Sequence, residues 1–160
     1  MVRGYETMDH ERFMRQALVE AERAADEDER PIGAVIVHDG RVVGRGRAQH
    51  RARGSEIAHA EMNALLNAER YVAAHHRECV VYTTVEPCVM CLGAIVMSDI
   101  EAVVYALPDN WIAPRAMLDM PYVVRHILYY KGGVLEAESA ALWERVNPRE
   151  LALIRSGVRS

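Results

Sequence analysis

The sequence feature that most constrains the fold of this chain is a set of metal-binding residue types divided between two distant segments. His59-Ala60-Glu61 forms one segment and Pro87-Cys88-Val89-Met90-Cys91 the other, with 25 residues between them. Cysteines three positions apart share one face of a helix, and a proline at or just before the first turn suits the start of a helix. We therefore expect the fold to bring the histidine segment against the start of a cysteine-bearing helix.

Two thiolates and one imidazole give Zn²⁺ three protein ligands and leave its fourth position for water. A helix N-terminus favours thiolates, and zinc with an open position lowers the pKa of bound water to about 7. Glu61 lies two residues after His59, and a proton shuttle requires a carboxylate that is near the metal without being a ligand. The residues predict a zinc site with His59, Cys88 and Cys91 as ligands and Glu61 as the catalytic residue.

Two other interpretations of the cysteine pair stay open. A structural zinc site normally has a fourth Cys or His ligand, but the third cysteine, Cys79, lies just before an apolar run, where a buried thiol is expected. A redox pair would leave the His59 segment unexplained. The adjacent His75 and His76 can also chelate a metal, although neighbours on a turn more often face solvent.

These segments resemble the zinc-dependent cytidine/deoxycytidylate deaminase superfamily, whose signature combines His-x-Glu with Pro-Cys-x-x-Cys. Residues 31–35 and 82–86 are similar to the first and third strands of the branch that contains cytosine, guanine and tRNA adenosine deaminases, and residues 92–95 fit the same branch. The resemblance runs roughly from residue 11 to 104. It implies a Zn²⁺ cofactor and the hydrolysis of an exocyclic amine to a carbonyl with release of ammonia.

The resemblance also implies which segments contact the substrate. The backbones of Ala60 and Cys88, the latter preceded by Pro87, would meet the exocyclic group or the ring edge. The loop after the fourth strand, where the family places specificity residues, supplies further candidates: Asp109, Asn110 and Trp111. An indole such as that of Trp111 can stack on a ring or fill a dimer interface.

One position departs from the resembled branch. An asparagine usually stands eleven residues before the zinc histidine and holds the base, but this chain has Ala48 there. A methyl group neither donates nor accepts a hydrogen bond, so base recognition must differ. Gln49 or His50 can substitute for the asparagine, or this segment is a simple loop.

Hydrophobic periodicity and turn signals predict an α/β fold. Asp39-Gly40 is a strong hairpin signal between two strands. The expected helices cover residues 10–26, 58–70, 88–98 and 136–146, and the expected strands cover residues 32–37, 41–46, 79–85, 100–107 and a stretch within 127–135. This order gives a three-layer α-β-α sandwich with a five-stranded mixed sheet, in agreement with the cytidine deaminase-like fold. We expect one domain over residues 1–160, with residues 1–7 as a loose leader.

Length and charge limit the classes of partner. A chain of 160 residues can bury a real core. Its three cysteines suggest a reducing, cytoplasmic location, and we expect no membrane partner. The net charge of −4 disfavours a nucleic-acid partner, which usually meets a basic surface. The arginine run from Arg41 to Arg53 is either such a surface or a solvated strand and loop. The resemblance implies a homodimer.

Three functional hypotheses follow. The first is a hydrolytic deaminase of a small-molecule heterocycle, such as a cytosine-, guanine- or triazine-like ring. The alternative is a tRNA-specific adenosine deaminase that forms inosine. The third is a non-catalytic, zinc-stabilised binding module, against which Glu61 argues because a structural site has no use for a free carboxylate.

Overall fold

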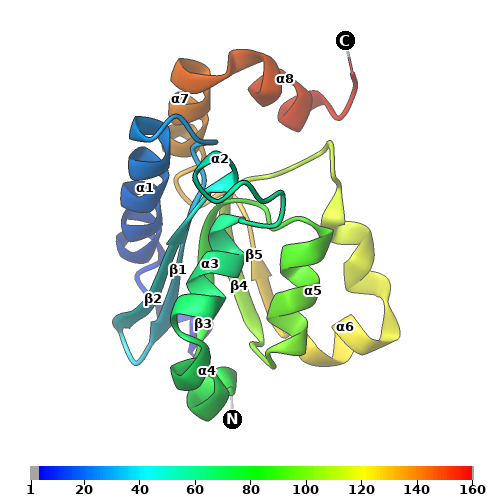
Figure 1. The fold of residues 1–160 in the computed structure, drawn as a ribbon. Helices are drawn as coiled ribbons and strands as arrows, with labels where there is room; N and C mark the ends of the chain where they lie inside the picture. Colours follow the sequence, from blue (N-terminus) through cyan, green and yellow to red (C-terminus); the bar gives the residue numbers. More distant parts are fainter. Residues whose placement is uncertain (1–3, 160) are drawn as a thin grey trace.

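A computed structural model describes residues 4–159 of the chain. At its centre is a five-stranded mixed sheet with the order β2-β1-β3-β4-β5 (Figure 1). β1 pairs antiparallel with β2 and β3, whereas β3, β4 and β5 run parallel. The strands are β1 (Gly33–His38), β2 (Arg41–Arg47), β3 (Val80–Val85), β4 (Ala102–Leu107) and β5 (Tyr129–Lys131). The predicted sheet is confirmed.

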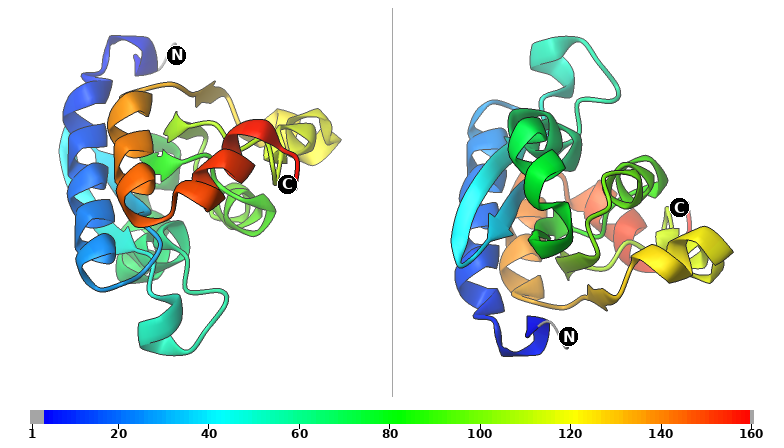
Figure 2. Two further views of the ribbon diagram at one scale, coloured as in Figure 1. Left: turned by 90° about the horizontal axis from the view of Figure 1, so that it is seen from above. Right: turned by 90° about the horizontal axis from the view of Figure 1, so that it is seen from below.

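Helices cover both faces of the sheet and make three layers (Figure 2). One face packs against α1 (His10–Asp26) and α7 (Glu136–Val146), and the other against α3 (Ala60–Asn67) and α5 (Val89–Met97). The shorter elements are α2 (His50–Arg53), α4 (Glu69–His75), α6 (Pro121–His126) and α8 (Pro148–Ser156), with 3-10 turns η1 (Tyr5–Thr7), η2 (His76–Glu78) and η3 (Pro114–Asp119). No helix between residues 4 and 159 is long and apolar enough to cross a bilayer.

The central strands carry the chain into the functional segments. Every residue of β3 and β4 is buried, as expected for strands with helices on both sides. The β1–β2 turn has positive φ at Asp39 (48°) and Gly40 (69°), the conformation that a tight hairpin requires. β3 ends at Val85, so the chain reaches Cys88 just beyond the end of a buried strand.

Two glycines let helices approach the sheet closely. A Cβ atom at Gly33 would lie 2.2 Å from the Ala17 carbonyl oxygen in α1, and one at Gly46 would lie 2.1 Å from the Ala60 carbonyl oxygen in α3. Both neighbours are backbone atoms that cannot rotate away. Gly46 in β2 therefore sets how closely the sheet can approach the first turn of α3, next to His59.

We expect Gly46→Ala to push α3 away from the sheet. Overpacking of this kind costs about 1–3 kcal/mol, which lowers Tm by roughly 2–10 °C in a domain of this size. Gly93→Ala is the matched control, because a Cβ there would meet no atom within 4 Å. Thermal unfolding of both variants checks this, and an unchanged Tm in Gly46→Ala would contradict the close packing.

The structure corrects three expectations about local order. Residues 1–7 are not a loose leader throughout, because Tyr5 is buried in the core under α1; residues 1–3 lie outside the described part. The helix expected over 58–70 is two helices, since Ala68 leaves the helical conformation (φ −118°, ψ 14°). The segment of Gln49 and His50, for which a simple loop was one of the expectations, contains the short helix α2.

Candidate active site and zinc site

The three predicted zinc ligands meet where α3 and α5 begin. His59 caps α3, Cys88 caps α5, and Cys91 lies in the first turn of α5. His59 Nδ1 is 3.5 Å from the Sγ atom of Cys88 and 3.5 Å from that of Cys91. The residues that the sequence separates thus form one cluster, whose three donor atoms lie within 4.8 Å of one another.

The spacing of these atoms fits a tetrahedral zinc ion. Zinc bonds of about 2.0–2.1 Å to nitrogen and 2.3 Å to sulfur hold the two ligands about 3.6 Å apart at a tetrahedral angle. The nitrogen–sulfur distances of 3.5 Å match that value. Two cysteines and one histidine leave one coordination position for a non-protein ligand, as catalytic zinc sites do.

The pKa values of Cys88 and Cys79 are shifted in opposite directions. Hydrogen bonds from the Cys91 thiol and then from His59 lower the pKa of Cys88 to about 4, against the opposing effect of burial. The Cys88 sulfur also accepts from the Cys91 backbone N–H, 3.5 Å away, as the cap of α5. By contrast, burial raises the pKa of Cys79 to about 11. Cys88 is therefore a thiolate at neutral pH, and Cys79 is an inert buried thiol.

Glu61 lies in the first turn of α3 and is almost completely buried, with 4% of its surface exposed. Its Oε1 accepts a hydrogen bond of 2.8 Å from the hydroxyl of Thr83 in β3. Burial raises the pKa of Glu61 above the usual carboxyl value, and the hydrogen bond from Thr83 only partly offsets this effect. Thr83 could not be predicted from the sequence, because a threonine in a buried strand carries no signal of such a role.

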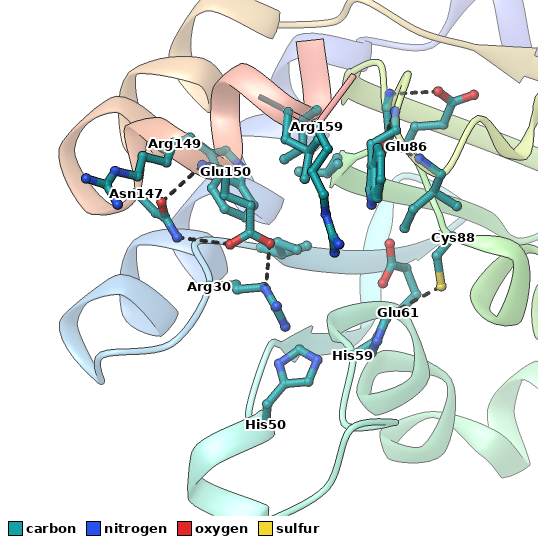
Figure 3. Close-up of a pocket in the computed structure, with 18 residues that line it drawn as sticks. Arg30, His50, His59, Glu61, Glu86, Cys88, Asn147, Arg149, Glu150 and Arg159 are labelled. Atoms are coloured by element: carbon teal, nitrogen blue, oxygen red, sulfur yellow. Dashed lines mark hydrogen bonds and ion pairs between the residues drawn. The ribbon is translucent and has the colours of Figure 1, made fainter. Parts of the chain in front are cut away.

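A cavity of about 600 Å³ opens above this cluster (Figure 3). Its floor contains His59, Glu61 and Cys88, and its roof is formed partly by Leu153 and Ile154 of α8. The helix α8 therefore covers the His59, Glu61 and Cys88 side chains, which the sequence did not predict because helix periodicity does not report where a helix packs.

Two of the loop residues proposed for substrate binding line the cavity. Trp111 is 42% exposed, and the side chain of Arg159 lies over its ring at 5.6 Å from the ring centroid. Asp109 is buried, and its Oδ1 accepts hydrogen bonds of 2.9 Å from the backbone N–H groups of Trp111 and Ile112. Asp109 therefore shapes the loop that presents the indole.

Other proposed substrate residues contact the protein. Asn110 does not line the cavity; its side chain donates to the Arg155 carbonyl oxygen at 2.7 Å and accepts from Arg115 at 2.6 Å. Gln49 accepts from Arg53 at 3.2 Å and is also outside the cavity lining. Ala60 and Pro87 are buried beside the ligands, without side chains in the cavity lining.

His50 lines the cavity beside His59, with the two ring centroids 4.9 Å apart. Its side chain is 10% exposed, and its buried Nδ1 has no hydrogen-bond partner among the described residues. The nearest carboxylate oxygen, Oε2 of Glu29, is 4.0 Å away. Ala48, at the position where the resembled branch has asparagine, is fully buried and donates its N–H to Ile32. His50 is thus the polar side chain that this segment offers to the cavity.

Comparison with known proteins identifies the family. Residues 7–107 match the family described as "Cytidine and deoxycytidylate deaminase zinc-binding region". The chain belongs to this deaminase family. The match spans more than half of the chain and includes all three proposed ligands, and it confirms both the resemblance and the zinc cofactor.

Curated relatives of this deaminase include tRNA adenosine deaminases. The chain is 39% identical over 104 residues to the tRNA-specific adenosine deaminase of Aquifex aeolicus, covering 64% of this chain and 69% of the relative. It is 40% identical over 99 residues to the chloroplastic tRNA(adenine(34)) deaminase of Arabidopsis thaliana. The aligned residues make up 61% of this chain but only 8% of that much longer relative.

Solved structures confirm the deaminase fold. A structure from a study of A-to-I editing by tRNA:A34 deaminases superposes with a TM-score of 0.74 at 34% identity, covering 82% of this chain and 98% of that one. The guanine deaminase of Bacillus subtilis gives a TM-score of 0.57 at 38% identity, covering 62% of this chain and 64% of that one. The relatives thus include both of the substrate classes that the sequence analysis weighed.

Proposed function

We propose that this chain is a hydrolytic deaminase that converts an exocyclic ring amine to a carbonyl and releases ammonia. The observation that carries the proposal is Glu61, a buried carboxylate beside a His/Cys/Cys cluster and outside its ligand set, at the floor of a cavity. A zinc-stabilised binding module needs no such group. When bound, zinc lowers the pKa of a water molecule and so provides a nucleophile at neutral pH.

The chain's own residues supply the proton transfers. The Glu61 carboxylate accepts a proton from the attacking water and delivers it to the ring nitrogen, and a second transfer protonates the departing amine. A carboxyl group that must both accept and release protons works best with a pKa near the operating pH. Burial of Glu61 shifts its pKa in that direction, and the Thr83 hydroxyl holds the carboxylate in place.

We further propose adenosine in tRNA as the first substrate to test. The sequence analysis placed this substrate second, and the comparisons favour it, because the curated relatives at 39–40% identity are named as tRNA adenosine deaminases. The study of tRNA:A34 deaminases also supplies a structure that aligns over almost its whole length.

A free nucleobase or a related heterocycle is the second candidate, and the structure gives it specific support. α8 covers the cavity, which suits a small substrate. Most of the arginine run is paired within the chain: Arg47 bonds to Glu27 through two nitrogens, at 2.8 and 2.9 Å, and Arg51 pairs with Asp28. Arginines held by carboxylates are less available to phosphates.

Salt dependence separates the two candidates. If tRNA is the substrate, the KM for an anticodon stem-loop should rise with salt, since affinity for single strands falls with a log–log slope of about −0.7 per phosphate contact. The test is to measure ammonia release and KM at two salt concentrations, with the stem-loop, cytosine, guanine and a triazine as substrates. Arg51→Ala/Arg53→Ala should reduce the slope, and Arg145→Ala, which removes a pair with Glu22, is the control. If only a free heterocycle is turned over, and its KM does not change with salt, the second candidate is favoured.

We expect His50→Ala to weaken substrate recognition. Loss of one buried hydrogen bond to the substrate costs about 1–3 kcal/mol, which corresponds to a decrease of roughly 5- to 150-fold in kcat/KM. Gln49→Ala is the matched control, because Gln49 contacts Arg53 and not the cavity. Steady-state kinetics with zinc content measured in parallel check this. A larger effect in Gln49→Ala than in His50→Ala would reverse the assignment.

A further inference from the structure

A second group of metal-binding side chains lies at the opposite end of the sheet from the active site. His38 ends β1 beside the first residues of β3, His75 ends α4, and Glu78 lies in η2. One donor atom from each lies within 4.8 Å of the other two. Figure 1 shows α4 and the β1–β2 turn at the lower end of the molecule, away from α2 and α8.

The contacts of His38 can leave one of its ring nitrogens with a free lone pair for a cation. Its Nε2 is 2.7 Å from Oε2 of Glu78, and its Nδ1 is 2.7 Å from the hydroxyl oxygen of Tyr71. Histidines that bind metals usually donate their other ring N–H to an oxygen, which fixes the tautomer. The Tyr71 oxygen can accept from Nδ1–H, and the lone pair of Nε2 then faces Glu78. The ring of His75 stacks on that of His38 at a centroid distance of 4.7 Å.

We infer that His38, His75 and Glu78 form a second binding site for a divalent transition-metal ion, with Zn²⁺ as the ion to test. Two imidazoles and one carboxylate suit zinc and its neighbours, whereas Mg²⁺ and Ca²⁺ prefer sites made of oxygen atoms. The site is separate from the proposed function, since it shares no residue with the active site. An ion there would join the end of β1 to α4 and η2.

Small side-chain movements would complete the coordination. Zinc bonds of about 2.0–2.2 Å place two nitrogen or oxygen ligands about 3.3 Å apart, whereas His75 Nδ1 is 3.9 Å from Oε2 of Glu78. The side chains of His75 and Glu78 are 41% and 66% exposed and so have room to adjust, while that of His38 is 15% exposed and contacts Tyr71. Glu78 Oε2 would move slightly away from His38 Nε2, now 2.7 Å away, and His75 would move toward Glu78.

A hydrogen-bonded surface network is the competing account of this cluster. In it the Tyr71 hydroxyl donates to Nδ1 of His38, and Nε2–H donates to Glu78, so all groups are satisfied without a cation. The two accounts differ in what a metal titration of the full-length chain should find.

Equilibrium dialysis against Zn²⁺ tests the inference. We expect two zinc ions per wild-type chain, the weaker of which is lost in His38→Gln and in His75→Gln. Tyr71→Phe should weaken that ion about 10- to 100-fold, because it removes the oxygen that orients His38. His126→Gln is the control: His126 also lies near a carboxylate, Asp99 at 3.7 Å, but belongs to neither cluster.

Co²⁺ titration assigns each ion to its site without a measurement of activity. Cobalt bound by Cys88 and Cys91 gives intense thiolate charge-transfer absorption, whereas cobalt bound by nitrogen and oxygen gives only weak bands. The first equivalent should give the intense absorption, and the second should add weak bands that His75→Gln abolishes. A single zinc ion per wild-type chain, or a second ion that persists in both His38→Gln and His75→Gln, would overturn the inference.

Discussion

Glu61→Ala is expected to lose most turnover and to retain both zinc and fold. General acid–base catalysis contributes about 10²–10⁴-fold to a reaction, and in the proposed mechanism this carboxylate serves more than one proton transfer. Its removal should not lower the free energy of unfolding, because burying a charged group is costly. Glu61 is buried, and the rise in its pKa reflects that cost.

The measurements are kcat, zinc content and Tm on the same preparation. Glu61→Gln is the closest isostere, since it keeps the volume and can still accept the hydrogen bond from Thr83. Both variants should be slow, and Thr83→Val should be slowed less, because that residue only positions the carboxylate. A Glu61→Ala enzyme with near wild-type turnover would place the proton shuttle elsewhere.

Removal of a proposed zinc ligand should abolish the tightly bound, thiolate-coordinated metal. His59→Ala, Cys88→Ala and Cys91→Ala each leave two protein ligands where a catalytic zinc site needs three. We expect one equivalent of metal to be lost on dialysis against a chelator, together with activity. Metal analysis and the cobalt charge-transfer band measure the loss directly.

Cys79→Ala is the control for this experiment. Cys79 is fully buried just before β3, and its pKa of about 11 keeps it protonated. Its replacement should lower stability through lost packing and leave the tightly bound zinc unchanged. Full retention of that zinc in Cys91→Ala would refute the ligand assignment.

The sequence predicted the parts of this protein that depend on local pattern. The hairpin at Asp39-Gly40 follows from turn chemistry, and the buried strands follow from runs of β-branched residues. The spacing of Cys88 and Cys91 at a helix start brings both sulfurs to one side. These features are decided by residues close together in the chain. The long-range meeting of His59 with the two cysteines, at 3.5 Å, was predicted from the ligand chemistry of the two motifs.

The sequence could not predict what depends on distant partners. Tyr5 is ordered by packing against Tyr129, at 5.4 Å between ring centroids, and no local signal marks that contact. The choice between Gln49 and His50 depends on the direction of their side chains where a four-residue helix begins. η3 and α6 were not expected, although prolines at positions 114 and 121 begin them, because proline also marks loops.

The position of β2 gives its arginines a role in solubility. In the sheet formed by residues 4–159, β2 is an outer strand and one side of its backbone has no strand partner. Such an edge is a template for aggregation with another chain. Arg41 and Arg45 are exposed along it, and charge on an edge strand opposes that association. Arg41 and Arg45 should therefore oppose self-association at this edge, whichever substrate the cavity accepts.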